Sequence, residues 1–210
     1  MATRTIGGIE ALKAAMTGAF VRPDDLDHEQ VRNVWMAAMI NHHPAVIVRC
    51  ATAQDAAQAI RFAQNQGLEL VVRSGAHSAP GLRDLDAATQ RYGLAVPAGL
   101  VSHTGVADLT VGGGMGWLIR QAGLSIDNLV SAEVVVADGK ILRATEDDNP
   151  HLFWAIRGGG GNFGVVTELE FRLHDVDPVV QFGLLFWDAR EGEQALRLMR
   201  DTIADLPRTL

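Results

Sequence analysis

The stretch that decides the fold is NPHLFWAIRGGGGNFGVVTELEFRLH, residues 149–174. Asn149 and Pro150 are residue types that open helices, at the N-cap and at the first helical position. Four glycines follow at 158–161, and apolar residues then alternate with polar ones from Val165 to Leu173, which is the periodicity of a strand. The stretch therefore predicts a helix, a glycine turn and a strand.

The glycines of this stretch also satisfy the dinucleotide motif G-x-G-x-x-G, at Gly159, Gly161 and Gly164. In a Rossmann fold these glycines follow a strand and open a helix, so that the helix N-terminus faces the pyrophosphate. Here the helix comes first and the strand second. The order argues against a Rossmann site.

Working outward, the chain mixes helices with hairpins. Thr52 and Asp55 mark a helix N-terminus and Gly67 its end, while Asp138-Gly139 is a strong hairpin signal. Helices are expected at 29–40, 52–66, 85–92, 117–122, 150–157 and 191–205, and strands at 45–49, 68–72, 131–137, 140–144, 165–173 and 179–187. This pattern predicts an α+β fold.

Composition narrows the range of partners. The 210 residues carry a formal net charge of −7, which argues against duplex nucleic acid or an anionic membrane as the main partner. Cys50 is the one cysteine, so no intrachain disulfide can form. We find no signal peptide pattern and no apolar window of membrane-spanning length. A cytoplasmic location is the expectation.

Three glycine-rich segments stand out, at 73–81, 105–116 and 158–164. Glycine lets main-chain N–H groups converge on an anion and lets the chain approach a flat ring. Each segment alone is explained as a tight turn. Three in one small protein favour a phosphate-bearing ligand.

The loop RSGAHS, residues 73–78, carries the most chemistry. Arg73 could bind a phosphate through two hydrogen bonds, and the amides from Ser74 to Ser78 could form an anion nest. His77 is a nucleophile that could attach to an electrophilic cofactor carbon; an ordinary surface histidine is the alternative.

The remaining polar candidates are less specific. Asp127 and Asn128 could cap the following strand or bind a ligand hydroxyl, and both interpretations stay open. The other histidines have no metal-ligand spacing with cysteine or with one another: His42, His43, His103, His151 and His174. No metal site is expected.

Several segments, taken in order, resemble one family. They are Trp35, PAVIVRC (44–50), VRSGAHS (72–78), GGGMG (112–116), DNL (127–129), VVADG (135–139) and LFWAIRGGGGNFGVVT (152–167). The set resembles the FAD-binding domain of berberine bridge enzyme-like oxidases, in the vanillyl-alcohol oxidase (PCMH-type) superfamily, from about residue 30 to residue 190. The resemblance implies a PCMH-type FAD-binding fold, with FAD held between two small α+β lobes.

The same resemblance divides the chain and assigns its site. Residues 1–28 would be an N-terminal extension, 29–84 the first lobe, 85–176 the second lobe and 177–210 the start of a substrate domain. His77 matches the histidine that bonds covalently to the flavin 8α-methyl group, and Thr104-Gly105 would lie along the isoalloxazine ring. The implied FAD contacts are Arg73, Ser74, Gly75, Ala76, His77, Ser78, Thr104, Gly105, Gly112, Gly113, Gly114, Gly116, Asp127, Asn128, Val165 and Val166.

The sequence departs from the family pattern in three ways. Val101 stands where many members carry a second flavin-linking cysteine, so at most one covalent link is expected. Gly81 leads straight into the helix at 85–92, without the strands and cofactor loop that the family has there, so the fold is expected to be internally shortened and incomplete. The substrate domain with its catalytic tyrosine is expected to be missing; Tyr92 does not match that tyrosine, and no catalytic residue is assigned.

The resemblance implies an FAD-dependent oxidoreductase of the oxidase type, which passes hydride from a substrate C–H to flavin N5 and is reoxidised by molecular oxygen. The substrate would be a small molecule of unknown identity. The alternative is a non-catalytic remnant, or an FAD- or nucleotide-binding module without turnover.

Overall fold

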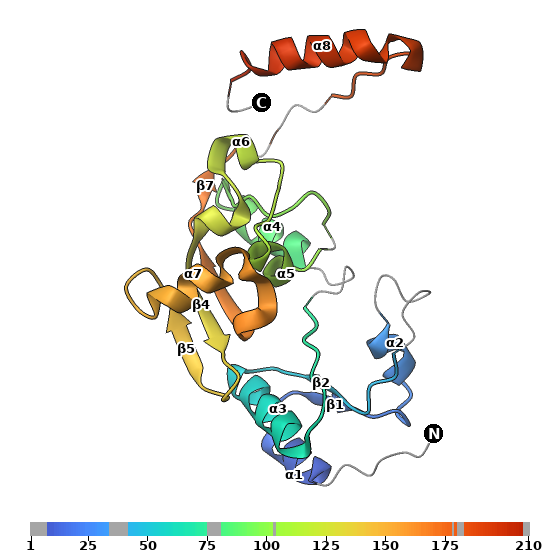
Figure 1. Cartoon of the computed structure of the whole chain (residues 1–210), viewed down its shortest axis with the longest axis vertical. Helices are drawn as coiled ribbons and strands as arrows, with labels where there is room; N and C mark the ends of the chain where they lie inside the picture. The colour runs from blue at the N-terminus through green and yellow to red at the C-terminus, as the bar shows by residue number, and fades with distance from the viewer. Residues whose placement is uncertain are drawn as a thin grey trace.

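A computed structural model describes residues 8–33, 42–74, 81–102, 104–177, 179 and 183–207. Three parts follow one another along the long axis of the molecule (Figure 1). A first lobe, residues 8–74, lies at one end. A second lobe, residues 81–177, lies in the middle, and a C-terminal helix lies at the other end.

The first lobe combines α1 (Ile9–Ala15), β1 (Ala19–Val21), α2 (His28–Arg32), β2 (Ile47–Arg49) and α3 (Ala53–Gln66). β1 and β2 pair antiparallel, and α1 packs against α3. Residues 9–21, expected as part of an extension, therefore lie within this lobe.

α3 is the helix that the sequence specified best. The Thr52 side chain accepts from the Asp55 amide, and Gly67 closes the helix with a left-handed φ of 60°. The Asp55 carboxylate is 1% exposed and accepts main-chain hydrogen bonds of 2.9 Å from Thr17, Gly18 and Ala51. The hydrogen bond from the Thr17 amide, helped by those from its neighbours, lowers the Asp55 pKa against a smaller effect of burial. Both predicted ends of α3 are confirmed.

The second lobe is built on a three-stranded antiparallel sheet of order β5-β4-β6. Its strands are β4 (Leu129–Val135), β5 (Ile141–Ala144) and β6 (Val165–Phe171), and a short pair is formed by β3 (Leu94–Ala95) and β7 (His174–Asp175). Its helices are α4 (Gly81–Gln90), α5 (Val106–Val111), α6 (Ile119–Ala122) and α7 (Pro150–Gly159), with 3-10 turns η1 (Ser125–Asn128) and η2 (Gly160–Phe163). The predicted β4–β5 hairpin and the α7–β6 order are confirmed.

One face of this sheet forms the main core. Phe153 and Ile156 of α7 pack on Ala132, Val134 and Ala144, which are fully buried. Burying one such large apolar side chain contributes roughly 1.5–3 kcal/mol. On the other face, Arg143 pairs with Glu168 and Glu170. α7 therefore covers one side of the sheet, and the end of the opposite side at Val135 is covered by α3.

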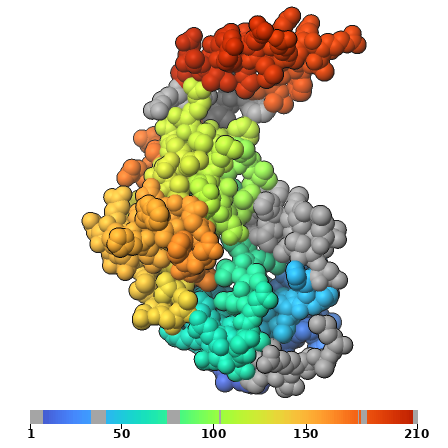
Figure 2. All heavy atoms as spheres, viewed as in Figure 1, coloured from blue at the N-terminus to red at the C-terminus, as the bar shows by residue number. Residues whose placement is uncertain are grey.

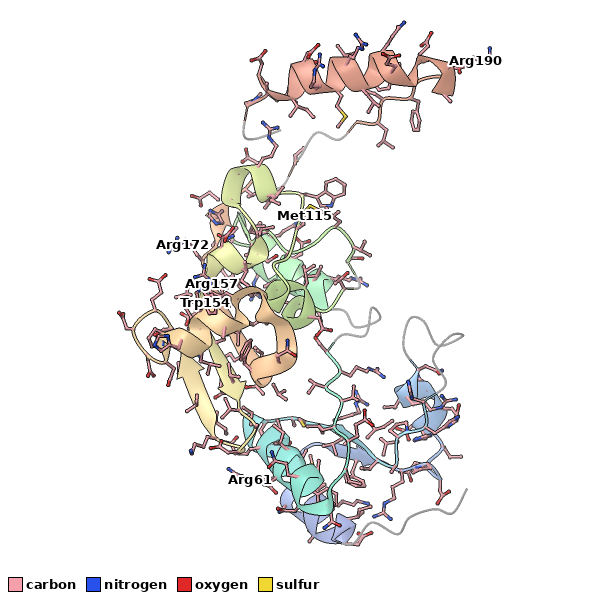
Figure 3. All side chains as sticks on the ribbon, viewed as in Figure 1. Arg61, Met115, Trp154, Arg157, Arg172 and Arg190 are labelled. Carbon is pink, nitrogen blue, oxygen red and sulfur yellow. The ribbon has the colours of Figure 1, made fainter. Side chains whose placement is uncertain are left out.

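The two lobes meet where α3 reaches the β4–β5 hairpin. Ala56, Ala57 and Ile60 pack on Val135. Arg61 donates to the carbonyl oxygens of Asp138 and Gly139 (Figure 3), and Gln64 donates to Ala137 O at 2.7 Å. A small apolar contact bordered by hydrogen bonds to one turn thus joins the lobes.

Several predicted elements differ from the structure. The helix expected at 29–40 ends at Arg32, because Asn33 is extended; residues 34–41 lie outside the described part. α5 was not predicted, α4 begins four residues before the predicted start, and α6 begins at Ile119 rather than at residue 117.

Two predicted strands are absent from the described residues. Leu68–Val72 has no regular structure, and Val71 is 82% exposed. Val179 and residues 183–187 also have none. A strand exists only when a neighbour completes its hydrogen bonds, and neither segment has a paired neighbour here.

The chain ends with η3 (Ala189–Glu191) and α8 (Gly192–Ile203), which confirms the predicted amphipathic helix. α8 lies beyond the end of the second lobe (Figures 1 and 2), and Arg120 of that lobe donates to Leu206 O at 2.9 Å. Among the described helices, none has the length and apolar character needed to cross a membrane.

Candidate functional site

Two of the three glycine-rich segments lie side by side in the second lobe. α5, which leads into Gly112–Gly116, packs against both α7 and η2, the elements that carry glycines 158–161. The result is a surface, which we call the glycine surface, formed by residues 112–116 and 158–164.

Some glycines of this surface are explained by close packing. A Cβ at Gly114 would collide with Ser125, and one at Gly116 would lie 2.9 Å from the Gly99 nitrogen. At Gly164 it would lie 2.6 Å from the Val135 carbonyl oxygen. These three glycines are needed by the fold itself.

Other glycines face open space. A Cβ at Gly113, Gly158, Gly160 or Gly161 would meet no atom within 4 Å. Gly113 and Gly158 have φ values of 114° and 108°, a region that glycine adopts without strain. Main chain left bare in this way can approach a flat ring closely, so the glycine surface fits a flavin nucleotide, the group that the resemblance implies.

The first-lobe part of the predicted site is only partly described. Arg73 Nη1 donates to the carbonyl oxygens of Val31 and Asn33, the latter at 3.1 Å, so this nitrogen fastens the end of α2. Ser74 is half-buried. The predicted contacts at Gly75, Ala76, His77 and Ser78 lie outside the described residues.

Thr104 and Gly105 precede α5. The Thr104 amide donates to Val101 O at 3.1 Å, and Gly105 O accepts from Leu109 at 3.3 Å. Gly105 is buried and Thr104 half-buried. They thus anchor the helix that presents Gly112 to the glycine surface.

Asp127 and Asn128 make structural contacts. Asp127 accepts from the Leu124 amide at 2.9 Å. Asn128 is 3% exposed and donates to the carbonyls of Ala122 and Leu124, while its Oδ1 lies 2.5 Å from His174 Nε2. These bonds hold η1 and the start of β4, which favours the capping interpretation of the two.

The side chains of Val165 and Val166 pack within the protein core. Val165 packs on the α3 contact and Val166 on the core under α7, and both pair with β4. Their main chain is therefore held in the ladder immediately after Gly164.

A hollow of about 370 Å³ lies away from the glycine surface and is lined by α3 and by residues 139–142. The two cationic side chains that line this hollow already have partners within the protein. Arg61 donates to the carbonyl oxygen of Gly139, and Lys140 pairs with Asp138 at 2.7 Å. No cluster of three His, Cys, Asp or Glu side chains able to hold a metal occurs in the described ranges.

Comparisons with known proteins agree with this geometry. Residues 79–145 match the FAD binding domain family. The (R)-6-hydroxynicotine oxidase of Paenarthrobacter nicotinovorans is 32% identical over 219 residues, 88% of this chain and 48% of that protein. The crystal structure of 6-hydroxy-D-nicotine oxidase from Arthrobacter nicotinovorans superposes with a TM-score of 0.73 and 31% identity, covering 76% of this chain and 43% of that one.

A glucooligosaccharide oxidase from Acremonium strictum, described as carrying a 6-S-cysteinyl, 8α-N1-histidyl FAD, superposes with a TM-score of 0.70 and 25% identity over 80% of this chain and 43% of that one. The chain thus spans about half the length of the relatives it matches. The predicted α+β fold of the PCMH type is confirmed by these likenesses.

The comparison with the Paenarthrobacter oxidase also supports an internal shortening. Its 219 aligned positions exceed the 210 residues of the chain. Since 88% of 210 residues is about 185, roughly 34 of the aligned positions have no counterpart here.

Proposed function

We infer that this chain, a homologue of FAD-linked oxidoreductases that carries an FAD binding domain, is the FAD-binding part of a flavoprotein oxidoreductase. The glycine surface carries the inference, because it joins two segments in which Gly113, Gly158, Gly160 and Gly161 leave main chain bare with no atom packed against it. The resemblance drawn from the sequence is the independent support.

Part of the predicted set has a role in this proposal, together with two glycines of the second segment. Gly112, Gly113, Gly158 and Gly160 would let the main chain pass close to the flavin, and Thr104 and Gly105 would hold α5 beside it. Residues 73–78 would bind the pyrophosphate, with His77 as the point of covalent attachment. The flavin, when bound, supplies the capacity to accept hydride from a substrate C–H.

The reaction class follows from the relatives. Those named above are oxidases of a hydroxynicotine and of an oligosaccharide, so we propose oxidation of a small molecule, with molecular oxygen as the final acceptor. A cytoplasmic location fits a chain whose one cysteine, Cys50, is free and exposed.

A pair of glycine variants tests FAD binding. Neither Gly161 nor Gly192 has an atom within 4 Å of an added Cβ, and neither has a left-handed backbone, so valine is sterically tolerated at both. Gly161→Val would fill the glycine surface and weaken FAD binding at least about tenfold, equivalent to about 1.4 kcal/mol. Gly192→Val lies in α8 and would leave it unchanged, as measured by flavin fluorescence titration.

The covalent link is tested separately. After acid precipitation, the wild-type chain should keep its flavin absorbance, and His77→Ala should release it.

Equal FAD affinity in both glycine variants, or no flavin binding by the wild type, would contradict the assignment of the glycine surface.

A second candidate is an FAD-binding module without turnover. The exposed Val71 and the positions missing from the alignment favour it, since the first lobe then lacks material that the relatives have. Reduction of bound flavin by 6-hydroxynicotine or by an oligosaccharide, followed at 450 nm under anaerobic conditions, decides in favour of the oxidoreductase.

A further inference from the structure

Two side chains of α3 hold a single turn of the second lobe. Arg61 Nη2 donates to Gly139 O at 2.7 Å, and Arg61 Nε donates to Asp138 O at 3.4 Å. Gln64 Nε2 donates to Ala137 O at 2.7 Å. Arg61 and Gln64 are three residues apart, so they lie on one face of α3, beside the turn between β4 and β5 (Figure 1). First-lobe side chains therefore bind three consecutive main-chain carbonyls of the second lobe.

The turn that accepts these hydrogen bonds is itself fixed. Gly139 has a φ of 76°, and its amide donates to Val136 O at 2.8 Å. Asp138 Oδ1 accepts from the Lys140 amide at 2.9 Å. A Cβ at Gly139 would lie 2.4 Å from Arg61 Nε, so the guanidinium packs directly on the bare main chain of this turn. A tilt of α3 against the sheet would therefore break these hydrogen bonds.

The apolar part of the contact between the lobes gives less direction. It consists of Ala56, Ala57 and Ile60 against Val135. Apolar burial is non-directional, and a small interface between lobes normally permits relative motion. Hydrogen bonds depend on angle as well as on distance, so the α3 side chains that hold the turn fix the orientation that the apolar contact leaves open.

The same contact reaches both parts of the proposed FAD site. On the first-lobe side, α3 ends at Gln66 and the chain then leads to residues 73–78, the proposed pyrophosphate segment. On the second-lobe side, Val135 pairs with Val165, and its carbonyl oxygen would lie 2.6 Å from a Cβ at Gly164. The last glycine of the glycine surface is thus packed against the residue that α3 covers.

We propose that Arg61 is a positioning residue for FAD: it fixes the angle between the lobes and so aligns residues 73–78 with the glycine surface. This inference rests on the proposed function, in which FAD contacts both lobes. In this role Arg61 acts through the turn, without touching the cofactor itself. FAD binding and docking of the lobes are then linked, so each favours the other by the same factor.

Flavin fluorescence titration of three variants tests this role. Arg61→Met keeps an unbranched, helix-forming side chain but removes its donors, and it should weaken FAD binding about tenfold, within the usual range of coupling between sites. Arg61→Lys keeps a cationic donor and should recover part of the affinity. Arg190→Met is the matched control and should leave the affinity unchanged, because the Arg190 side chain is 93% exposed and lies at the far end of the molecule (Figure 3).

The distance between the lobes gives a second readout, which does not depend on FAD affinity. In a Cys50→Ser background, spin labels at Asn65→Cys in α3 and His151→Cys in α7, both exposed positions, should give one narrow distance distribution by double electron–electron resonance. Arg61→Met should widen this distribution. Added FAD should narrow it again, since a ligand that contacts both lobes favours the docked arrangement.

Different results would overturn the proposed function and this inference. If the chain with Arg61 intact binds no FAD, the proposed function fails, whatever the distances show. If that chain binds FAD but Arg61→Met binds it equally well, or keeps an equally narrow distance distribution, Arg61 has no positioning role. A loss of helix content in Arg61→Met by circular dichroism would also overturn the inference, because Arg61 would then support α3 itself.

Discussion

At the scale of single residues, Gly164 shows why a motif glycine need not be a ligand-binding one. Its φ is 150°, and an added Cβ would lie 2.6 Å from main-chain oxygen of Val135. Gly164→Ala should lower the free energy of unfolding by at least about 2 kcal/mol through backbone strain and displacement of β4. Urea unfolding followed by circular dichroism measures this, with Gly192→Ala as a control that should not destabilise. A neutral Gly164→Ala would contradict the β4–β6 geometry.

The buried carboxylate of Asp55 joins α3 to the neighbouring main chain of the first lobe through hydrogen bonds. Hydrogen bonds from the Thr17 amide and its neighbours lower the folded pKa of Asp55 below the ordinary 3.8. Asp55 therefore stabilises the fold above pH 3.8, and this stabilisation is lost as the pH falls through the folded pKa. Asp55→Asn should cost about 1–2 kcal/mol near neutral pH. The difference between wild type and variant should shrink on acidification toward pH 3, as unfolding free energies measured against pH would reveal. A difference independent of pH would rule out this role.

At the scale of elements, the segment 68–72 has the sequence of a buried strand, but in the structure it is unpaired and exposed. Val71→Asp should change the free energy of unfolding by less than about 0.5 kcal/mol, because Val71 is exposed. Val134→Ala, in the fully buried core, should cost about 1–3 kcal/mol. Thermal and urea unfolding of the two variants test the contrast. A large loss from Val71→Asp would mean that this segment is paired after all.

At the scale of the whole molecule, the two lobes and the C-terminal helix share little core. The roughly 34 positions of the Paenarthrobacter oxidase that have no counterpart in this chain offer a reason. The sequence predicts the shortening between the loop at 73–81 and α4. Inserting there the corresponding stretch of the Paenarthrobacter oxidase should cover Leu70 and Val71. The insertion should raise the thermal midpoint by several degrees, about what 1–2 kcal/mol produces in a chain of this size, and increase strand content by circular dichroism. The same number of Gly-Ser residues is the control, and equal midpoints for the two insertions would place the shortening elsewhere.

The sequence by itself determined the elements whose hydrogen bonds are local. α3 with its caps, the β4–β5 hairpin at Asp138-Gly139 and the α7–β6 order could all be predicted, because caps, turns and helices are specified within a few residues. The likeness to FAD-linked oxidoreductases could be predicted from the order of the motifs. Only the tertiary structure showed that Arg73 fastens the end of α2, that Asn128 is committed to carbonyls, and that the glycines divide into packed and open ones. It also decided that 68–72 and 183–187 are not strands, since the partner that completes a strand lies far away in the sequence and must be present in space.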